Sequence, residues 1–290
     1  MISMKGILLS LVSLFYGTIY SQNPYEPDFS KPKKINHYKL VWNDEFNYNG
    51  KPDSTKWIYE YGFVRNEELQ WYQPKNATCK NGVLLIEGRR EIVQNPNYVA
   101  ISSDWKENRE HAYYTSASLK TEGLASWKYG VFEIRARIDS TLSSWPAIWT
   151  LGNNNPWPAN GEIDIMEFYI KNNEQSILAN AAWLGKYPRI VWDSKVIPLA
   201  YFLKKDPDWV KKFHIWRMEW DQNSIKIYID NELINKISQK KAKNPDGFKP
   251  FNQEHYLLLN LAIGSNGGDP TDSKFPISYE VDYARIYQKE

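Results

Sequence analysis

A short segment of the chain reads GEIDIMEF and carries three carboxylates, Glu162, Asp164 and Glu167. The apolar residues between them are strand formers, so we expect the segment to form a β-strand. Side chains alternate between the two faces of a strand, which places Glu162 and Asp164 on one face and Glu167 on the other. One extra residue, a β-bulge near Ile165 or Met166, would return Glu167 to the first face.

Three acids on one face of a strand would have chemical consequences. Because neighbouring negative charges oppose each other's ionisation, at least one of the three pKa values should rise. One carboxyl could then act as a base or nucleophile while its neighbour acts as an acid. The alternative is that the acids form the solvated face of an edge strand. The surrounding aromatic residues favour a sugar-binding site, because flat apolar rings suit sugar faces: Trp145, Trp149 and Trp157 precede the acids and Tyr169 follows them.

The composition indicates a globular protein that is rich in aromatic side chains. The chain has 290 residues and a net charge of +2, so neither nucleic acid nor an anionic membrane is expected as a partner. It contains 13 Trp and 20 Tyr. Some of these rings must belong to the core, but so many amphipathic rings also indicate a stacking surface for a ligand.

The N-terminus has the pattern of a secretory signal peptide. Lys5 precedes an apolar run from Ile7 to Tyr20, and cleavage is expected near Ser21, which assigns residues 1–21 to the signal peptide. The run is shorter than the roughly 20 residues that a membrane span needs, although a membrane anchor is the alternative. We expect a secreted or periplasmic protein without an internal disulfide, because Cys79 is its single cysteine.

The rest of the chain is expected to form one all-β domain. Residues 22–36 contain three prolines among polar residues and are interpreted as a linker, and residues 37–290 show no second linker and no repeat. Many short segments alternate polar and apolar residues between turn residues, which predicts a β-sandwich. Long loops are expected over residues 94–112 and 184–212, with a helical turn near Pro207–Lys212. The clearest predicted strands are Val83–Glu87, Val131–Ile138, Phe213–Trp220, Ser224–Ile229, Tyr256–Ala262 and Tyr279–Tyr287.

With these features, the chain resembles glycoside hydrolase family 16, and within it the laminarinase and lichenase branch of endo-β-glucanases. The resemblance follows the chain in order over nearly all of residues 37–290. The matching motifs are LVWNDEF from Leu40, NGVLLIEG from Asn81, YTSASLKT from Tyr114, YGVFEIRARI from Tyr129, SWPAIWTLG from Ser144, WPANGEIDIMEF from Trp157, FHIWRMEWD from Phe213, LLNLAIG from Leu258 and VDYARIYQ from Val281.

This resemblance implies a fold and a mechanism. The implied fold is an all-β jelly roll whose substrate cleft crosses a concave sheet. The implied roles are Glu162 as the nucleophile, Glu167 as the general acid/base and Asp164 as the acid that tunes the nucleophile. A retaining mechanism of this kind needs two carboxyl groups about 5 to 5.5 Å apart, which neighbours on one bulged strand can supply. The chemistry needs no metal or other cofactor.

The resemblance also implies substrate-binding residues. Asn66 matches a position that bonds the sugar on the non-reducing side of the cleavage point. Trp145 and Trp149 match aromatic positions that line the cleft, with core packing as the alternative for each. Two positions depart from the family pattern. Ser118 stands where many members have Arg, which puts the subsite preference in doubt, and Trp183 stands where many laminarinases have a short HG-type motif, so that it either lines the leaving-group side or caps the core.

A calcium site on the convex side of the sandwich is common in the family. The matching positions here are Glu45, Gly82 and Asp282, which would offer the oxygen ligands that calcium prefers. The alternative is that the two acids are ordinary surface residues. We expect such a calcium ion to stabilise the fold and to take no part in the chemistry.

The expected function is therefore that of a secreted, monomeric, endo-acting enzyme that cleaves β-1,3-glucan or mixed-linkage β-1,3/1,4-glucan by double displacement. A galactan hydrolase of the same family, such as an agarase or porphyranase, is one alternative. Its sulfated substrates would favour Arg or Lys near the acids, and no such cluster is evident. A non-catalytic β-glucan-binding protein is a second alternative, although such relatives lack the catalytic acids. A transglycosylase is a third, because a retaining enzyme can pass the glycosyl group to another sugar.

Overall fold

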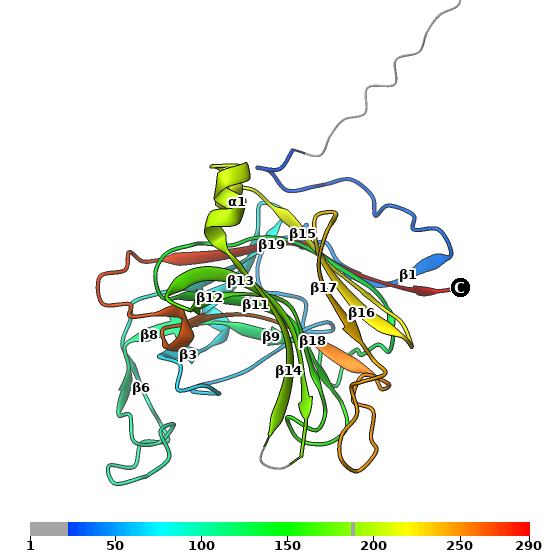
Figure 1. Ribbon diagram of the computed structural model, residues 1–290. Coiled ribbons are helices and arrows are strands. Elements are labelled where there is room, and N and C mark those ends of the chain that lie inside the picture. The colour runs from blue at the N-terminus through cyan, green and yellow to red at the C-terminus, as the bar shows by residue number, and fades with distance from the viewer. Residues whose placement is uncertain (1–22, 187–188) are drawn as a thin grey trace, which may run out of the picture.

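Two antiparallel β-sheets packed against each other form the body of the protein (Figure 1). The computed structural model describes residues 23–186 and 189–290, so the predicted signal peptide, residues 1–21, lies outside the described residues. The first sheet has eight strands in the order β17-β16-β15-β10-β19-β5-β4, with β1 paired to β19. Its strands are β1 (Tyr38–Asp44), β4 (Ala77–Lys80), β5 (Val83–Gly88), β10 (Gly130–Arg137), β15 (His214–Trp220), β16 (Ser224–Ile229), β17 (Glu232–Ser238) and β19 (Ile277–Lys289).

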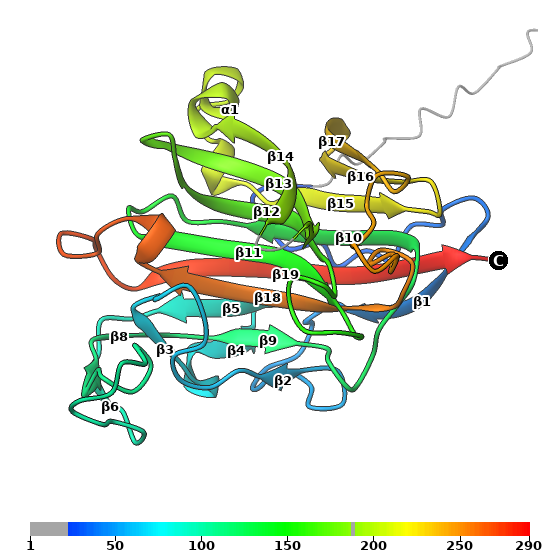
Figure 2. The same cartoon turned by 60° about the horizontal axis from the view of Figure 1, so that its bottom comes forward.

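The second sheet has seven strands in the order β14-β13-β12-β11-β18-β9-β2. Figure 2 shows β14, β13, β12, β11 and β18 side by side, so the segment with the three acids lies near the middle of this sheet. Its strands are β2 (Ile58–Tyr59), β9 (Ser118–Lys120), β11 (Ser144–Gly152), β12 (Glu162–Lys171), β13 (Glu174–Leu184), β14 (Ile190–Pro198) and β18 (His255–Ile263).

The remaining elements are short. Two small strand pairs join loops at one end of the sandwich, a parallel pair of β3 and β8 and an antiparallel pair of β6 and β7. The longest helix of the described residues, α1, has 7 residues, so within residues 23–186 and 189–290 no helix could cross a bilayer. These elements are β3 (Gln70–Tyr72), β6 (Val93–Gln94), β7 (His111–Ala112), β8 (Tyr114–Ser116), α1 (Leu199–Lys205) and the 3₁₀ turns Pro74–Asn76, Trp209–Lys211 and Ser265–Gly267.

Alternating side chains explain how the two sheets share one core. On β10, Phe132, Ile134 and Ala136 are all 0% exposed and point to the opposite sheet. The apolar side chains of β12 and β13 meet them from the other side. This arrangement confirms the all-β jelly-roll sandwich, and each of the six clearest strand predictions overlaps an observed strand.

Two regions differ from the sequence-based expectation. The predicted loop 184–212 contains both β14 and α1, because β14 completes the edge of the second sheet by pairing with β13 along its whole length. The segment interpreted as a linker packs on the outer face of the first sheet over its described part. There the backbone N–H of Phe213 donates to the carbonyl of Pro24 at 2.7 Å. Residues 23–30 therefore act as part of the domain.

Candidate active site

The acid-bearing strand β12 is bulged at the predicted place. In its pairing with β13, Asp164 lies opposite Asn180 and Glu167 lies opposite Leu178. Three steps along β12 thus correspond to two steps along β13, which means that β12 holds one extra residue. The register between β12 and β11 shifts at the same place, where Ile165 is passed over. The predicted β-bulge is confirmed.

The bulge turns all three acids toward one cleft on the outer face of the second sheet. Ile165 and Met166 both face the core, at 1% and 0% exposure, so that Glu167 returns to the face of Glu162 and Asp164. The cleft has a volume of about 770 Å³. Its other lining residues are Arg65, Asn66, Glu68, Trp145, Ala147, Trp149, Leu151, Trp157, Tyr169, Lys171, Leu178, Asn180, Trp192, Ser194, Val196, Asn260 and Asn266.

Asp164 is the most deeply buried of the three acids, with 1% exposure. Burial raises its pKa well above the usual range, and the negative charges of Glu162 and Glu167 raise it further. Burial and the like charges both favour the protonated form of Asp164 over its carboxylate. A protonated carboxyl can donate a hydrogen bond, and such a bond to Glu162 lowers the pKa of Glu162.

Glu167 is held by two donors, one from each neighbouring strand. The indole N–H of Trp145 on β11 donates to its Oε1 at 3.0 Å, and Nδ2 of Asn180 on β13 donates to its Oε2 at 2.9 Å. Burial, followed by the charge of Glu162, raises the pKa of Glu167 to about 8, although both donors act to lower it. Glu167 thus carries a proton at neutral pH and has a fixed orientation, as a general acid requires.

Glu162 accepts a hydrogen bond from the indole N–H of Trp157 at 2.7 Å on its Oε2. Burial raises its pKa, and the donors Trp157 and Asp164 and the charge of Arg65 act in the opposite direction. The pKa of Glu167, in contrast, is also raised by the charge of Glu162. The two outer acids of the cluster therefore have environments suited to different protonation states, one as carboxylate and one as acid.

Known proteins with similar sequences identify the family to which this chain belongs. The family model described as "Glycosyl hydrolases family 16" matches residues 73–285 of the chain. The chain belongs to glycosyl hydrolase family 16. A beta-glucanase from Rhodothermus marinus is 35% identical to it, and the match covers 88% of this chain and 87% of that protein. This family 16 member is therefore a glycosidase.

Two further relatives of this family 16 chain have different names. The keratan-sulfate endo-1,4-beta-galactosidase of Sphingobacterium multivorum is 27% identical, with the match covering 99% of this chain and 66% of that protein. A solved structure reported with endo-acting O-glycanases of the human gut microbiota that initiate mucin breakdown superposes with a TM-score of 0.80. Its sequence is 32% identical, and the superposition covers 90% of this chain and 94% of that chain.

Three of the four residues expected to bind substrate lie in the cleft of this family 16 enzyme. Asn66 lies in a loop at its rim with a φ of 55°, in the left-handed region, and it donates through Nδ2 to Oε1 of Glu68 at 3.3 Å. Trp145 and Trp149 both line the cleft from β11, at 6% and 8% exposure. Both indoles are thus almost fully covered by protein and present only a small remaining surface to the cleft.

Trp183 does not lie in the cleft. On β13, Ala182 is paired with Glu162 and shares its face, so Trp183 points to the opposite face of the sheet. It is 6% exposed, belongs to the core cluster, and its ring packs edge-on against Phe251 with centroids 6.0 Å apart. The assignment of Trp183 to substrate binding is therefore wrong, and the alternative of core packing holds.

The guanidinium of Arg65 supplies a positive charge near Ser118, although it comes from another segment of the chain. The hydroxyl of Ser118 donates to Oε2 of Glu60 at 2.6 Å, and Glu60 also forms an ion pair with Arg65. The Arg65 guanidinium lies over the Trp149 ring, 5.0 Å from its centroid, and Arg65 lines the cleft. The serine in the YTSASL motif is thus accompanied by an arginine from the loop that precedes Asn66.

Several cleft residues were not singled out from the sequence. Asn180 has no local signal, because its contact with Glu167 depends on the register of β12 and β13. Trp192 lines the cleft at 47% exposure and lies in a region expected to be a loop. Three apolar residues, three polar residues and three apolar residues follow one another along β14, so no alternation marks its cleft face. Only the pairing with β13 places Trp192, Ser194 and Val196 on that face.

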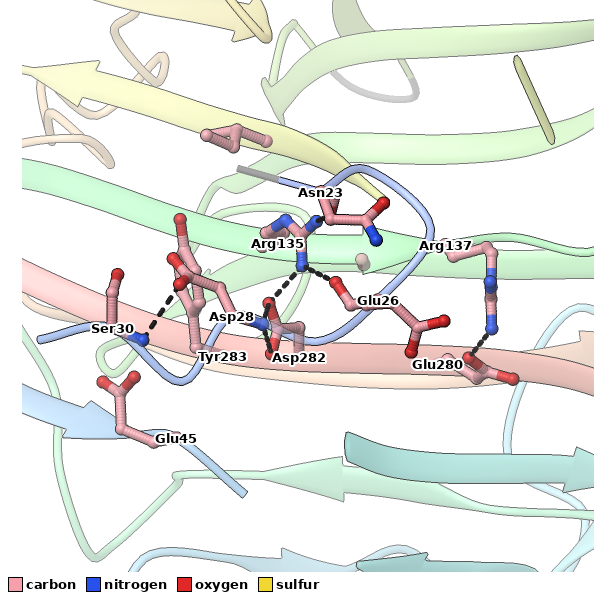
Figure 3. Close-up of polar contacts among 12 residues, drawn as sticks. Asn23, Glu26, Asp28, Ser30, Glu45, Arg135, Arg137, Glu280, Asp282 and Tyr283 are labelled. Atoms are coloured by element: carbon pink, nitrogen blue, oxygen red, sulfur yellow. Dashed lines mark hydrogen bonds and ion pairs between the residues drawn. The ribbon is translucent and has the colours of Figure 1, made fainter. Parts of the chain in front are cut away.

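Each of the two acids expected to bind calcium is paired with an arginine of the first sheet. Figure 3 shows Arg135 beside Asp282 on the outer face of this sheet, and Arg285 pairs with Glu45. Asp282 is 1% exposed, and its Oδ2 accepts a hydrogen bond from Nη1 of Arg135 at 2.5 Å. Both of its oxygens also accept the backbone N–H of Asp28 at 3.1 Å. Arg135 further donates to the backbone carbonyls of Glu26 and Asn23, each at 2.9 Å.

Glu45 is also paired with an arginine, and Gly82 is covered by the N-terminal segment. Glu45 accepts two hydrogen bonds from Arg285, at 3.0 Å from Nε and at 2.7 Å from Nη2. Gly82 faces the N-terminal segment so closely that a Cβ there would lie 2.7 Å from the ring of Phe29. A calcium ion would be placed beside guanidinium groups that repel it, so Glu45, Gly82 and Asp282 do not fit this ion. Over residues 23–186 and 189–290, no other group of acids, His or Cys is arranged to hold a metal.

We expect the stability of this enzyme to depend on Arg135 and to be independent of calcium. Replacing Arg135 by glutamine leaves the buried Asp282 without its ion partner, and breaking a buried pair in this way costs about 3–5 kcal/mol of unfolding free energy. The free energy of unfolding in urea should therefore fall by that amount, while Tm should be the same in EDTA and in excess calcium.

The matched control is Arg89→Gln. Arg89 pairs with Glu87 at 2.6 Å but is 33% exposed, and surface pairs contribute at most about 1 kcal/mol. A rise of Tm with calcium, together with an unchanged stability of Arg135→Gln, would show that the acids bind a metal after all.

Proposed function

We propose that this family 16 glycosidase is an endo-acting β-glucanase that retains the configuration of the anomeric carbon. The observation that carries the proposal is the bulge of β12, which brings Glu162, Asp164 and Glu167 into one cleft. Lining residues lie on both sides of β12, on β11 and β18 and on β13 and β14, so a polysaccharide can extend past the acids in both directions. The 35% identity to a beta-glucanase supports a glucan as the substrate.

In the first step, Glu162 attacks the anomeric carbon as a carboxylate and forms a covalent glycosyl-enzyme. Glu167 donates its proton to the departing glycosidic oxygen, so that the aglycone leaves as an alcohol. The environment of each residue supports this division, because the raised pKa of Glu167 keeps a proton available at neutral pH. Trp145 and Asn180 hold the two oxygens of Glu167 and thus fix the direction of proton transfer.

In the second step, Glu167 is a carboxylate and removes a proton from water, which attacks the anomeric carbon and releases Glu162. Asp164 supports both steps in its protonated form. A hydrogen bond donated by Asp164 to Glu162 would stabilise the negative charge that is present before the attack and develops again on release. The cycle needs only these side chains and water.

The sides of the cleft suggest how the substrate lies. Asn66 and Arg65 would contact the sugars on the non-reducing side of the cleavage point. Trp192, with almost half of its surface exposed, would offer a ring for the leaving-group side.

We also propose that the protein is exported through its N-terminal signal peptide and acts as a monomer, which secretion assays and size-exclusion chromatography can test.

The test is a substrate panel of laminarin, barley β-glucan, agarose, keratan sulfate and mucin, with analysis of product linkage and anomeric configuration. We expect oligosaccharides of β configuration from laminarin, barley β-glucan or both. Binding of glucan without release of oligosaccharide would favour a non-catalytic binding protein. Longer products at high oligosaccharide concentration, seen by mass spectrometry, would indicate transglycosylation.

A second candidate function is the cleavage of galactose-containing host glycans. It is favoured by the TM-score of 0.80 with the structure from the O-glycanase work and by the match over 99% of the chain to a keratan-sulfate endo-β-galactosidase. The same acids would perform the same chemistry on a different sugar. Release of products from keratan sulfate or mucin, and from neither glucan, would favour this function.

A further inference from the structure

A chain of hydrogen bonds runs from the cleft aromatic Trp149 to a fourth carboxylate, Glu68. The indole N–H of Trp149 donates to Oδ1 of Asn260 at 2.7 Å, and Nδ2 of Asn260 donates to the hydroxyl of Tyr72 at 3.0 Å. The Tyr72 hydroxyl in turn donates to Oε2 of Glu68 at 3.2 Å. Every donor in this chain points toward Glu68, so the chain ends on a group that must accept.

Glu68 holds a second cleft residue through its other oxygen. Nδ2 of Asn66 donates to Oε1 of Glu68 at 3.3 Å, which leaves Oδ1 as the amide atom of Asn66 that this network does not use. Nε2 of Gln70 donates to Oε2 of Glu68 at 2.6 Å, and Oε1 of Gln70 accepts the backbone N–H of Ile263 on β18 at 2.8 Å. Glu68 thus connects the rim loop, the cleft aromatic residue and β18.

The surroundings of Glu68 are those of a buried charge that is satisfied by donors. The residue is 2% exposed and accepts from Asn66, Gln70 and Tyr72. Burial raises its pKa, and the charge of Arg65 is the largest opposing influence. Burying a carboxylate costs desolvation free energy, and apolar residues often replace buried charges at no loss of stability. A buried Glu68 is therefore more easily explained by a function than by a contribution to stability.

We propose that Glu68 is a positioning residue whose ionised carboxylate fixes the amide of Asn66 and the indole of Trp149 for substrate binding. The ionised form can accept from Asn66 and Tyr72 together, and this leaves Oδ1 of Asn66 to accept a hydrogen bond from a sugar hydroxyl. A glutamine at position 68 would replace one carboxylate oxygen by an NH2 group, which cannot accept the hydrogen bonds that Asn66, Gln70 and Tyr72 donate. This inference rests on the proposed function, because it takes Asn66 and Trp149 as substrate contacts.

The charge of Glu68 has a second, measurable effect on the active site. It is one of the influences that raise the pKa of Glu167, after burial and the charge of Glu162. Removing the negative charge at position 68 should therefore lower the pKa of Glu167. The basic limb of the pH profile of kcat/KM, which reports the loss of the Glu167 proton, should then move to lower pH. A residue that only stabilised the fold would not move this limb.

The experiment compares Glu68→Gln and Tyr72→Phe with the wild-type enzyme on the best substrate of the panel. Loss of hydrogen bonds to a charged group should raise KM of Glu68→Gln about 10- to 100-fold, with a smaller fall of kcat. Tyr72→Phe removes one oxygen and breaks only the branch to Trp149, so its KM should rise less and its basic limb should stay in place. Glu174→Gln, at the exposed start of β13, is the control and should match the wild type in both readouts.

Circular dichroism and thermal melting establish first that each variant is folded. A folded Glu68→Gln with wild-type KM and an unmoved basic limb would overturn the inference. If Glu68→Gln does not fold, Tyr72→Phe decides, and an unchanged KM in that variant would equally overturn it. Failure of the proposed function looks different, since the wild-type enzyme would then release nothing from either glucan, and the same variants would be compared on the substrate that it does cleave.

Discussion

Glu162→Gln is expected to lose at least about 10²- to 10⁴-fold in kcat on laminarin while keeping the fold of the wild type. The amide is nearly the same size as the carboxylate and can still meet the indole of Trp157, so the packing of the cleft is preserved. It cannot attack the anomeric carbon, because it lacks the negative charge of the nucleophile. Reducing-sugar release under saturating substrate measures the loss.

Chemical rescue separates a nucleophile from other essential groups. In Glu162→Ala, an added azide ion should occupy the vacated space, attack the anomeric carbon and give a glycosyl azide of α configuration. Glu174→Gln serves as the control, because this glutamate lies on the neighbouring strand but is exposed. Substantial hydrolysis by Glu162→Gln, or a glycosyl azide of β configuration, would remove Glu162 from the nucleophile role.

The second large effect is expected for Glu167→Gln. This variant cannot protonate the leaving oxygen, so kcat/KM on laminarin should fall by about 10²- to 10⁴-fold. The wild-type enzyme should lose kcat/KM as the pH rises through about 8, because Glu167 then gives up the proton that it must donate. In the variant this basic limb should disappear, which a pH series of kcat/KM measures.

A substrate with an activated leaving group distinguishes an acid from a binding residue. A dinitrophenyl glycoside needs no proton to release its phenolate, so Glu167→Gln should form the glycosyl-enzyme from it almost as fast as the wild type and show a burst of phenolate. Hydrolysis of the intermediate should then be slow, because the same residue is the base for water. An equal loss on both substrates, with the basic limb retained, would contradict the assignment.

The sequence by itself determined which strand of this protein carries the catalytic acids, and that the strand must contain a bulge. Three acids in GEIDIMEF reach one face only if one residue is surplus, and the structure has that bulge between Asp164 and Glu167. The sequence alone can predict this because the alternation of side chains along a strand is a local property, set by the backbone of each residue in turn. The alternation that predicted β10 and β16 is local in the same sense, and both strands are observed.

Only the tertiary structure decided which partners each side chain meets. Trp183 and Trp192 both follow apolar residues in the sequence. The pairing of β13 with β14 places the side chain of Trp183 in the core and that of Trp192 in the cleft. Asp282 was expected to bind calcium, yet Arg135, 147 residues away in the chain, supplies its positive charge. Strand register and the pairing of distant charges depend on the packing of all the elements together, and no local pattern of residues encodes them.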